Sequence, residues 1–168
     1  NIKNTKCHGY GKYLTKNGFS IYGIFNENYL NDYAIIEKIS SNISYEGEFF
    51  KNKYDGYGIE MFEDGSVYYG EFVKNKKNGI GTYTWNDNSK YQGEFKNGLP
   101  NGLGYSYDNK NRYYSGEWKN GKMNGIGLYK WEDGRKYFGH FNNDKRDGFG
   151  IFLWTKPKLK IYLGFWVD

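Results

Sequence analysis

Short runs of alternating hydrophobic and polar residues recur along this chain at a nearly constant interval. The clearest run, Tyr-x-Gly-x-aromatic, has six complete copies, and a further copy beginning at Ile21 lacks only the first Tyr. The copies begin at residues 21, 45, 68, 91, 114, 137 and 162, so their separations are 24, 23, 23, 23, 23 and 25 residues. A fixed period of about 20 to 50 residues is typical of repeat proteins, and we therefore interpret the chain as one.

A second pattern, Gly-x-Gly, follows the last aromatic residue of a copy by seven residues, as from Phe49 to Gly56. A turn-forming pair such as Asp64-Gly65 stands between each Gly-x-Gly and the next Tyr-x-Gly. Such a pair between alternating runs predicts a tight β-hairpin whose two central residues both take positive φ. Each repeat is therefore predicted to be strand, turn, strand, and the hairpins must stack because a lone hairpin is marginally stable.

The glycine between two rings is expected to serve the packing of neighbouring hairpins. In Tyr91 to Phe95 the two rings and Gly93 share one face of the strand. Glycine weakens a strand unless another group approaches its backbone closely, which here would be a neighbouring ring. The residues expected to have this structural role are Gly47, Gly70, Gly93, Gly116, Gly139, Tyr68, Tyr91 and Tyr114.

These patterns together resemble the MORN repeat (membrane occupation and recognition nexus), and the resemblance covers essentially the whole chain. It implies an all-β fold: an elongated, twisted, single-layer antiparallel sheet of about seven consecutive hairpins. We place the hairpins at residues 9–25, 32–49, 56–72, 79–95, 102–118, 125–141 and 148–166 of a single array over residues 1–168. Both ends fall at repeat boundaries, which suggests a fragment of a longer protein.

Two repeats depart from the pattern. In the degenerate hairpin 32–49, Asp32-Tyr33-Ala34 stands in place of Gly-x-Gly. This indicates either a bend or specialised contact at this place, or a decayed repeat that still pairs its strands. In the hairpin 148–166 the turn is longer and contains Pro157.

Composition excludes several classes of protein. Aromatic residues make up 21% of the chain and there are 24 glycines, which argues against disorder because disordered segments are poor in aromatic residues. The net charge of +5 is mild, and the single cysteine cannot form an internal disulfide. The sequence shows no apolar run of about 18 residues and no charged-then-apolar N-terminal signal, so we expect neither a membrane span nor a secretory signal. A cytoplasmic location follows as the default expectation.

Few residues are suited to catalysis or metal binding. Cys7 and His8 are adjacent, so on a strand they point to opposite faces and cannot act together. No pair of cysteines or histidines has metal-ligand spacing, which leaves only a zinc shared across a dimer through Cys7 or His8 as a weak alternative. We expect no enzyme activity and no cofactor.

Basic residues concentrate in the segments that connect the hairpins. Stacking would align them along one edge, where they could meet anionic lipid headgroups, although lysines also simply guard exposed strand ends. The motif glutamates such as Glu71 are expected to moderate the positive charge. The lipid-binding candidates are Lys74, Lys76, Lys77, Lys119, Lys122, Lys145 and Arg146.

Aromatic residues that vary between repeats are the candidates for binding a protein partner. In a single-layer sheet one face has nothing of its own chain to cover it, and exposed aromatic surface usually meets a partner. The alternative is that these rings cover one another through the twist of the sheet. Stacking on single-stranded RNA is disfavoured because glutamates are interleaved, so no nucleic acid partner is expected. The face comprises Tyr83, Trp85, Tyr129, Trp131, Phe152, Trp154 and Phe62.

The expected function is that of a scaffold that binds protein partners or itself. Proteins with repeats similar to these occur in cytoskeletal and membrane-junction scaffolds, including the basal structures of apicomplexan parasites, and some form elongated homodimers. The resemblance also implies two alternatives. One is a module that binds phosphoinositides or other anionic phospholipids, and the other is an accessory domain of a larger lipid kinase or methyltransferase. A position at the periphery of a membrane or the cytoskeleton fits each of these.

Overall fold

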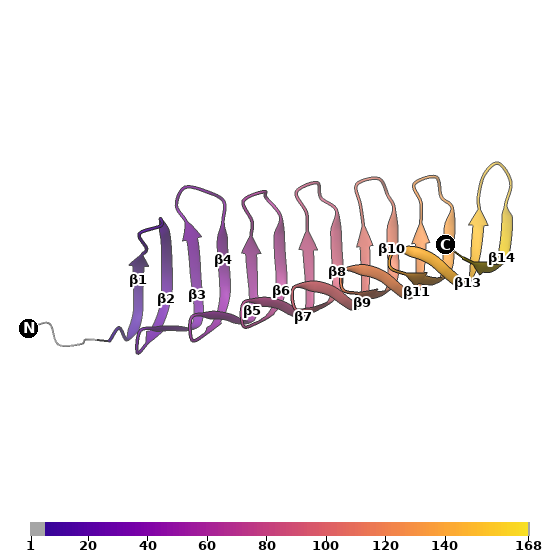
Figure 1. Ribbon diagram of the computed structural model, residues 1–168. Coiled ribbons are helices and arrows are strands. Elements are labelled where there is room, and N and C mark those ends of the chain that lie inside the picture. Colours follow the sequence, from indigo (N-terminus) through magenta and orange to yellow (C-terminus); the bar gives the residue numbers. More distant parts are fainter. Residues whose placement is uncertain (1–5, 168) are drawn as a thin grey trace, which may run out of the picture. The chain divides into compact units, whose positions relative to one another are not determined.

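The computed structural model describes residues 6–167, which contain strands and no helix. Fourteen antiparallel strands are ordered in the sheet as they are in the sequence (Figure 1). The predicted all-β fold of consecutive antiparallel hairpins is thereby confirmed. The chain divides into two compact units, Asn1–Asn86 and Asp87–Asp168.

Each unit contains seven strands. The first has β1 (Gly9–Leu14), β2 (Phe19–Asn26), β3 (Tyr29–Lys38), β4 (Ser44–Phe50), β5 (Lys53–Met61), β6 (Val67–Val73) and β7 (Lys76–Thr84). The second has β8 (Lys90–Lys96), β9 (Leu99–Tyr107), β10 (Tyr113–Lys119), β11 (Lys122–Lys130), β12 (Lys136–Asn142), β13 (Lys145–Trp154) and β14 (Lys160–Trp166).

Two kinds of turn alternate along the chain, and the tighter kind lies in the connectors and not in the segments where it was predicted. At Asp64-Gly65 only the glycine has positive φ, at 86°, and Phe62 and Ser66 close a longer loop through backbone hydrogen bonds. The connectors are instead the tight turns: Lys74 and Asn75 have φ of 49° and 67°. Two successive positive φ values define the type I′ hairpin turn, whose twist matches that of the flanking strands. The other connectors of this kind are residues 27–28, 51–52, 97–98, 120–121 and 143–144.

A tyrosine ring lying on glycine backbone forms the centre of each regular repeat. Tyr68 is fully buried, and its hydroxyl donates a hydrogen bond to the carbonyl of Glu71 at 3.0 Å. Its ring packs edge-on against Phe72, with 5.0 Å between centroids. Gly70 pairs with Gly81 across the sheet, and a Cβ atom on Gly70 would lie 2.5 Å from the Cα of Gly81. The two glycines therefore let the strands and the ring approach to a distance that no side chain would allow.

The motif glutamate has a backbone partner that the sequence did not predict. After Gly70 pairs with Gly81, the next pair is Phe72 with Lys77, so the longer strand bulges opposite Glu71. The Glu71 carboxylate accepts a hydrogen bond from the N–H of Ile80 at 3.1 Å, which supplies a partner that the bulge removes from the sheet. Equivalent bonds join Glu48 to Tyr57, Glu94 to Leu103 and Glu117 to Ile126.

The connectors dock on one another in a ladder along one edge of each unit. The N–H of Asn75 donates to the carbonyl of Tyr54, and its side-chain oxygen accepts from the N–H of Tyr54 at 2.8 Å. Asn52 with Leu30, Asn28 with Cys7 and Asp144 with Met123 repeat both bonds. Pro100 has no N–H to donate, and its partner is Gly121, which has no side-chain acceptor and makes only the backbone bond at 2.8 Å.

The degenerate hairpin keeps the pairing of the regular ones. β3 pairs with both β2 and β4. Asp32 takes the positive φ, 57°, that glycine has in the regular repeats, and Ala34 is buried at the position of the second glycine. The interpretation of this segment as a decayed repeat that still pairs its strands is the one that agrees with the structure.

Candidate binding face

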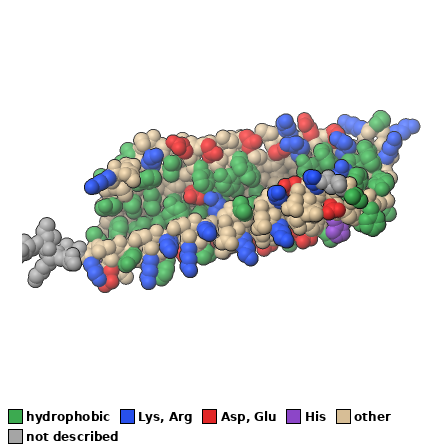
Figure 2. Space-filling model, viewed as in Figure 1, with side chains coloured by type: hydrophobic (Ala, Val, Ile, Leu, Met, Phe, Trp, Pro, Cys, Tyr) green, Lys and Arg blue, Asp and Glu red, His purple; other side chains and the backbone are tan. Residues whose placement is uncertain are grey.

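The inner face of each unit is the side on which the motif rings lie, such as Tyr45 and Tyr68 in the first unit and Tyr114 and Tyr137 in the second. On the first unit, Figure 2 shows hydrophobic side chains gathered in a hollow between two rims, with basic side chains along one of them. One rim is formed by the turns and the other by the connectors, as Figure 1 shows. The hollow is the candidate binding site of this unit.

Three of the predicted aromatic residues lie on the inner face of the first unit. Phe62 and Tyr83 are half-buried and their ring centroids are 5.7 Å apart, whereas Tyr83 and Trp85 are 4.9 Å apart. Trp85 is the most accessible of the three, with 40% of its surface exposed. The rings therefore cover one another in part and leave Trp85 accessible.

The other four predicted residues form a continuous ring cluster in the second unit. Tyr129 packs on Trp131 at 4.6 Å, Trp131 on Phe152 at 5.2 Å, and Phe152 on Trp154 at 4.3 Å between centroids. Phe152 is buried within the core of this unit, so it supports the face without being available to a partner.

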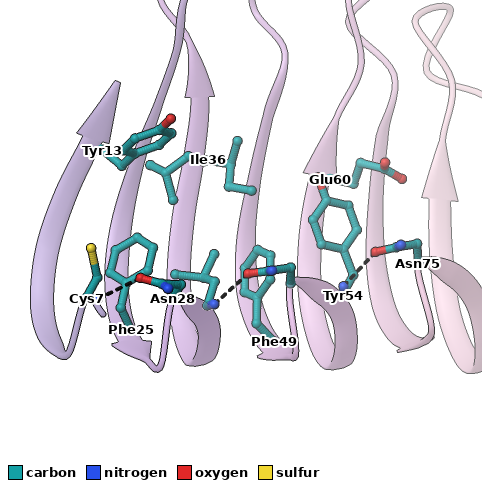
Figure 3. A pocket seen from close by; sticks show the side chains of 12 residues that line it. Cys7, Tyr13, Phe25, Asn28, Ile36, Phe49, Tyr54, Glu60 and Asn75 are labelled. Carbon is teal, nitrogen blue, oxygen red and sulfur yellow. Dashed lines mark hydrogen bonds between the residues drawn. The ribbon is translucent and has the colours of Figure 1, made fainter. Parts of the chain in front are cut away.

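A groove of about 800 Å³ is open on the inner face of the first unit (Figure 3). It arises where two isoleucines replace rings: Ile21 occupies the position of Tyr45 in the motif, and Ile36 occupies the position that Tyr83 has two repeats later. The smaller side chains leave the floor apolar but unfilled. The sequence shows both replacements, yet only the packing shows that no other ring fills the space. The groove is lined by Cys7, Tyr13, Ile21, Phe25, Asn28, Leu30, Ile36, Phe49, Asn52, Tyr54, Glu60 and Asn75.

Two of the basic candidates lie on the inner face instead of the exposed connector edge. The ammonium of Lys77 lies 2.9 Å from the Glu60 carboxylate and 4.6 Å from the ring centre of Phe62. The guanidinium of Arg146 lies 4.2 Å from the ring centre of Trp166 and 5.3 Å from that of Phe152. The remaining candidates are exposed at the connectors: Lys74, Lys76, Lys119, Lys122 and Lys145.

A hydrophobic row on the outer face was not anticipated from the sequence. The residue between the two glycines of each Gly-x-Gly points outward, and it is apolar in every regular repeat. Tyr57 and Ile80 in the first unit are 55% and 56% exposed, and Leu103 in the second is 64% exposed. The repeated Gly-apolar-Gly pattern was the available signal.

The Cys7 and His8 side chains are both exposed, and the N–H of Cys7 binds Asn28. Within residues 6–167, no three or more His, Cys, Asp or Glu side chains are grouped so that they could hold a metal ion. That same part of the chain contains no helix long and apolar enough to cross a membrane.

Burial raises the pKa of the core tyrosines Tyr45, Tyr68, Tyr91 and Tyr114 above the usual value, and it raises the pKa of Tyr54 to about 12. The folded protein therefore holds these protons more tightly than the unfolded chain, whose tyrosines titrate near pH 10. Their contribution to stability is complete below pH 10 and is lost as the pH rises through the folded-state values.

We accordingly expect the free energy of unfolding to be nearly constant from pH 7 to 9 and to fall steeply above about pH 10. For each buried tyrosine the fall should be up to about 1.4 kcal/mol per unit of pH, as the pH rises between the unfolded-state and folded-state pKa values. Urea unfolding followed by circular dichroism at each pH measures this. Absorbance at 295 nm should show the buried phenols ionising together with unfolding. Unchanged stability up to pH 12 would contradict the assignment of these tyrosines to the core.

No curated protein sequence matches this chain. The SAS-4 (dCPAP) TCP domain of Drosophila melanogaster, solved in complex with a proline-rich motif of Ana2 (dSTIL), is similar in structure. The similarity covers 91% of this chain and 88% of that chain, with 8% identity and a TM-score of 0.48.

The model of the MORN repeat family matches residues 1–19, 45–67, 68–90, 91–111, 114–134 and 137–156. Five of the matches begin at the first tyrosine of Tyr-x-Gly-x-aromatic, the residue whose ring lies on the paired glycines. The resemblance inferred from the sequence is confirmed, and the chain belongs to the MORN-repeat family.

Proposed function

We propose that this chain is a non-enzymatic scaffold module that binds a segment of another protein along its inner face, at a cytoskeletal or membrane-associated structure. The observation that carries the proposal is the groove of the first unit, whose volume of about 800 Å³ is not filled by side chains of the unit itself. A groove of this size with an apolar floor accommodates several side chains of a peptide.

The chemistry of the lining favours a protein ligand. Ile21, Ile36 and Leu30 contribute aliphatic side chains to the lining. Phe25 and Tyr54 add aromatic rings (Figure 3). Asn28, Asn52 and Asn75 line the connector side, where their side-chain oxygens already accept backbone hydrogen bonds. An apolar surface with a polar rim is the usual composition of a protein–protein interface.

Filling the groove tests the proposal. Ile36→Tyr introduces the residue that Tyr13, Tyr83 and Tyr129 provide at this position of their repeats, so the fold should be kept while the hollow is filled. A partner is first identified by cross-linking to the purified module, and its binding is then measured by calorimetry with both proteins purified. We expect Ile36→Tyr to weaken binding at least about tenfold, equivalent to about 1.4 kcal/mol.

The matched control is Ile80→Ser on the outer face, which removes a comparable exposed hydrophobic residue and should leave the affinity unchanged. If the wild type and Ile36→Tyr bind the partner equally well, the interface is not on the inner face. A loss of affinity with Ile80→Ser alone would lead to the same conclusion.

A second candidate is attachment to an anionic membrane through the connector edge. Its support is the exposure of Lys74, Lys76, Lys119, Lys122 and Lys145, each able to contribute about 1 kcal/mol near an anionic surface. Co-sedimentation with phosphoinositide vesicles at low salt should detect it. If the double variant Lys119→Glu, Lys122→Glu sediments like the wild type, the second unit's connector edge is not a membrane site.

Self-association of the module is a further part of the scaffold proposal. Light scattering on the purified chain at increasing concentration measures it directly. A monomeric mass throughout would exclude a homodimer formed by these repeats alone.

A further inference from the structure

The second unit contains an arginine that lies among aromatic rings without an acidic partner. The guanidinium of Arg146 lies 5.7 Å from the ring centre of Tyr137 and 5.9 Å from that of Trp131, in addition to its contacts with Phe152 and Trp166. It is half-buried and forms no ion pair or hydrogen bond with any residue that the structure describes. A guanidinium carries five N–H donors, and those of Arg146 remain able to bind a ligand.

Arg146 also lines a pocket of about 370 Å³ that opens on the inner face of this unit. Tyr129, Trp131 and Trp166 form apolar walls of the pocket, and Lys145 adds a second positive charge at its edge. Asp144 lines it too, but one of its carboxylate oxygens is bound to the N–H of Met123 at 2.8 Å. The pocket therefore combines a cationic side chain with flat aromatic surfaces.

The first unit contains a cation at the same repeat position that is neutralised by a carboxylate. Lys77 occupies the same place in its repeat as Arg146 and lies over the equivalent rings, Phe62, Tyr68 and Tyr83. Its ammonium is paired with Glu60 at 2.9 Å, and this pair is largely buried, with side-chain exposures of 17% and 23%.

Three repeats later, the position of Glu60 is occupied by Tyr129. The second unit thus repeats the cation and its ring surroundings but lacks the carboxylate. A half-buried positive charge is stabilised by a carboxylate. Arg146 has no carboxylate equivalent to Glu60, so a carboxylate is the group that would complement it.

We propose that the Arg146 pocket binds an acidic side chain, Asp or Glu, from a segment of a partner protein, with an adjacent apolar side chain of that segment against Trp131 and Trp166. This inference rests on the proposed function and names the chemistry of the partner at one site. The carboxylate forms a charge-assisted hydrogen-bonded pair with the guanidinium, equivalent to the pair that Glu60 forms with Lys77 within the chain.

The position of Arg146 favours a peptide over a lipid headgroup. Arg146 lies on the ring-covered inner face, whereas Lys122 is exposed at the connector end of β11. A flat membrane meets protruding connector lysines before it meets a half-buried guanidinium, but a single peptide side chain can enter the pocket.

A random dodecapeptide phage library is the probe that tests the inference. Peptides selected on the wild-type chain should be enriched in Asp or Glu next to an aromatic or aliphatic residue. The affinity of a fluorescein-labelled selected peptide is then measured by anisotropy, together with a copy in which each acidic residue is replaced by its amide. The amide copy should bind at least about tenfold more weakly, which corresponds to about 1.4 kcal/mol.

The repeats themselves supply variants that should fold normally. Arg146→Met introduces the residue that the preceding repeat has at the equivalent position, Met123. It should weaken peptide binding at least about tenfold. Tyr129→Glu supplies the internal carboxylate that Glu60 provides in the first unit, so it should lower the affinity while leaving Arg146 in place. Lys122→Met removes one charge from the exposed connector and should have no comparable effect. Circular dichroism and urea unfolding establish that each variant is folded.

The inference is wrong if the selected peptides show no acidic enrichment, or if Arg146→Met binds them as the wild type does. It is also wrong if Arg146→Met reduces sedimentation with phosphoinositide vesicles but not peptide binding, because the site would then belong to a lipid. If selected peptides bind without acidic residues but their binding still depends on the inner face, the proposed function stands and only this inference is wrong. If no inner-face variant affects the binding of any protein ligand, the proposed function itself is wrong.

Discussion

A valine at position 70 should unfold the centre of the first unit. Its Cβ atom would lie 2.5 Å from the Cα of Gly81 and 2.6 Å from the hydroxyl of Tyr68. Both obstacles are fixed, since Gly81 is paired in the sheet and the Tyr68 hydroxyl is bound to the backbone of Glu71. The strands must separate or the ring must leave the core, and either change should cost more than about 4 kcal/mol.

Urea unfolding of Gly70→Val and Tyr69→Val measures the effect with a matched control. Tyr69 is the preceding residue, points to the other face and is 57% exposed, so the same valine there should alter stability by less than about 0.5 kcal/mol. Because each repeat contacts only its neighbours, the loss should appear in the first unit before the second. A Gly70→Val chain as stable as the wild type would show that the glycine pairing is not a steric requirement.

Removing the ring of Tyr114 should have the second largest effect. The residue is 1% exposed, and its ring packs against both Trp118 and Phe141, at 5.2 and 5.1 Å between centroids. Tyr114→Ala leaves a cavity between two repeats and should lower the free energy of unfolding by about 3–5 kcal/mol. Tyr114→Phe keeps the ring and loses the hydrogen bond to the Glu117 carbonyl, 2.8 Å long, which should cost about 1 kcal/mol.

Urea unfolding monitored by circular dichroism separates these two contributions. The control is Tyr105→Ala, which removes the same ring from a position in the second unit that is 40% exposed and should cost markedly less than Tyr114→Ala. Equal losses for Tyr105→Ala and Tyr114→Ala would mean that burial between repeats is not what makes the motif ring important.

The sequence was sufficient to predict the architecture because the repeat multiplies a weak local signal. One Tyr-x-Gly-x-aromatic run is ambiguous, but copies about 23 residues apart define strands, their order and their antiparallel pairing. The turn types were harder to predict because both kinds of turn contain Asn, Asp or Gly. Asp64-Gly65 looks like a tight turn, yet the side chain of Asp64 holds Ser66 in a longer loop, while Lys74-Asn75 makes the tight one.

The candidate site was less predictable because it depends on which way each side chain points near a bulge. Lys76 and Lys77 are neighbours in a lysine-rich segment beside a connector. The pairing of Lys77 with Phe72 directs the Lys77 side chain to the inner face, while Lys76 stays exposed. The same register places Arg146 opposite Phe141, on the inner face. The structural role of Glu71 was missed for a related reason, since the bulge that leaves the N–H of Ile80 in need of a partner has no signature in the sequence.

The match between Pro100 and Gly121 has a consequence for how such a chain can grow. Repeat arrays lengthen when a block is duplicated, and most blocks here end in an Asn or Asp that needs an N–H from the block before it. If a copy of such a block were inserted directly after Pro100, the side-chain oxygen of its connector would have no backbone N–H from which to accept a hydrogen bond. Pro100 and Gly121 must therefore be inherited as a pair, which makes the border between their two repeats a poor place for recombination, either natural or engineered.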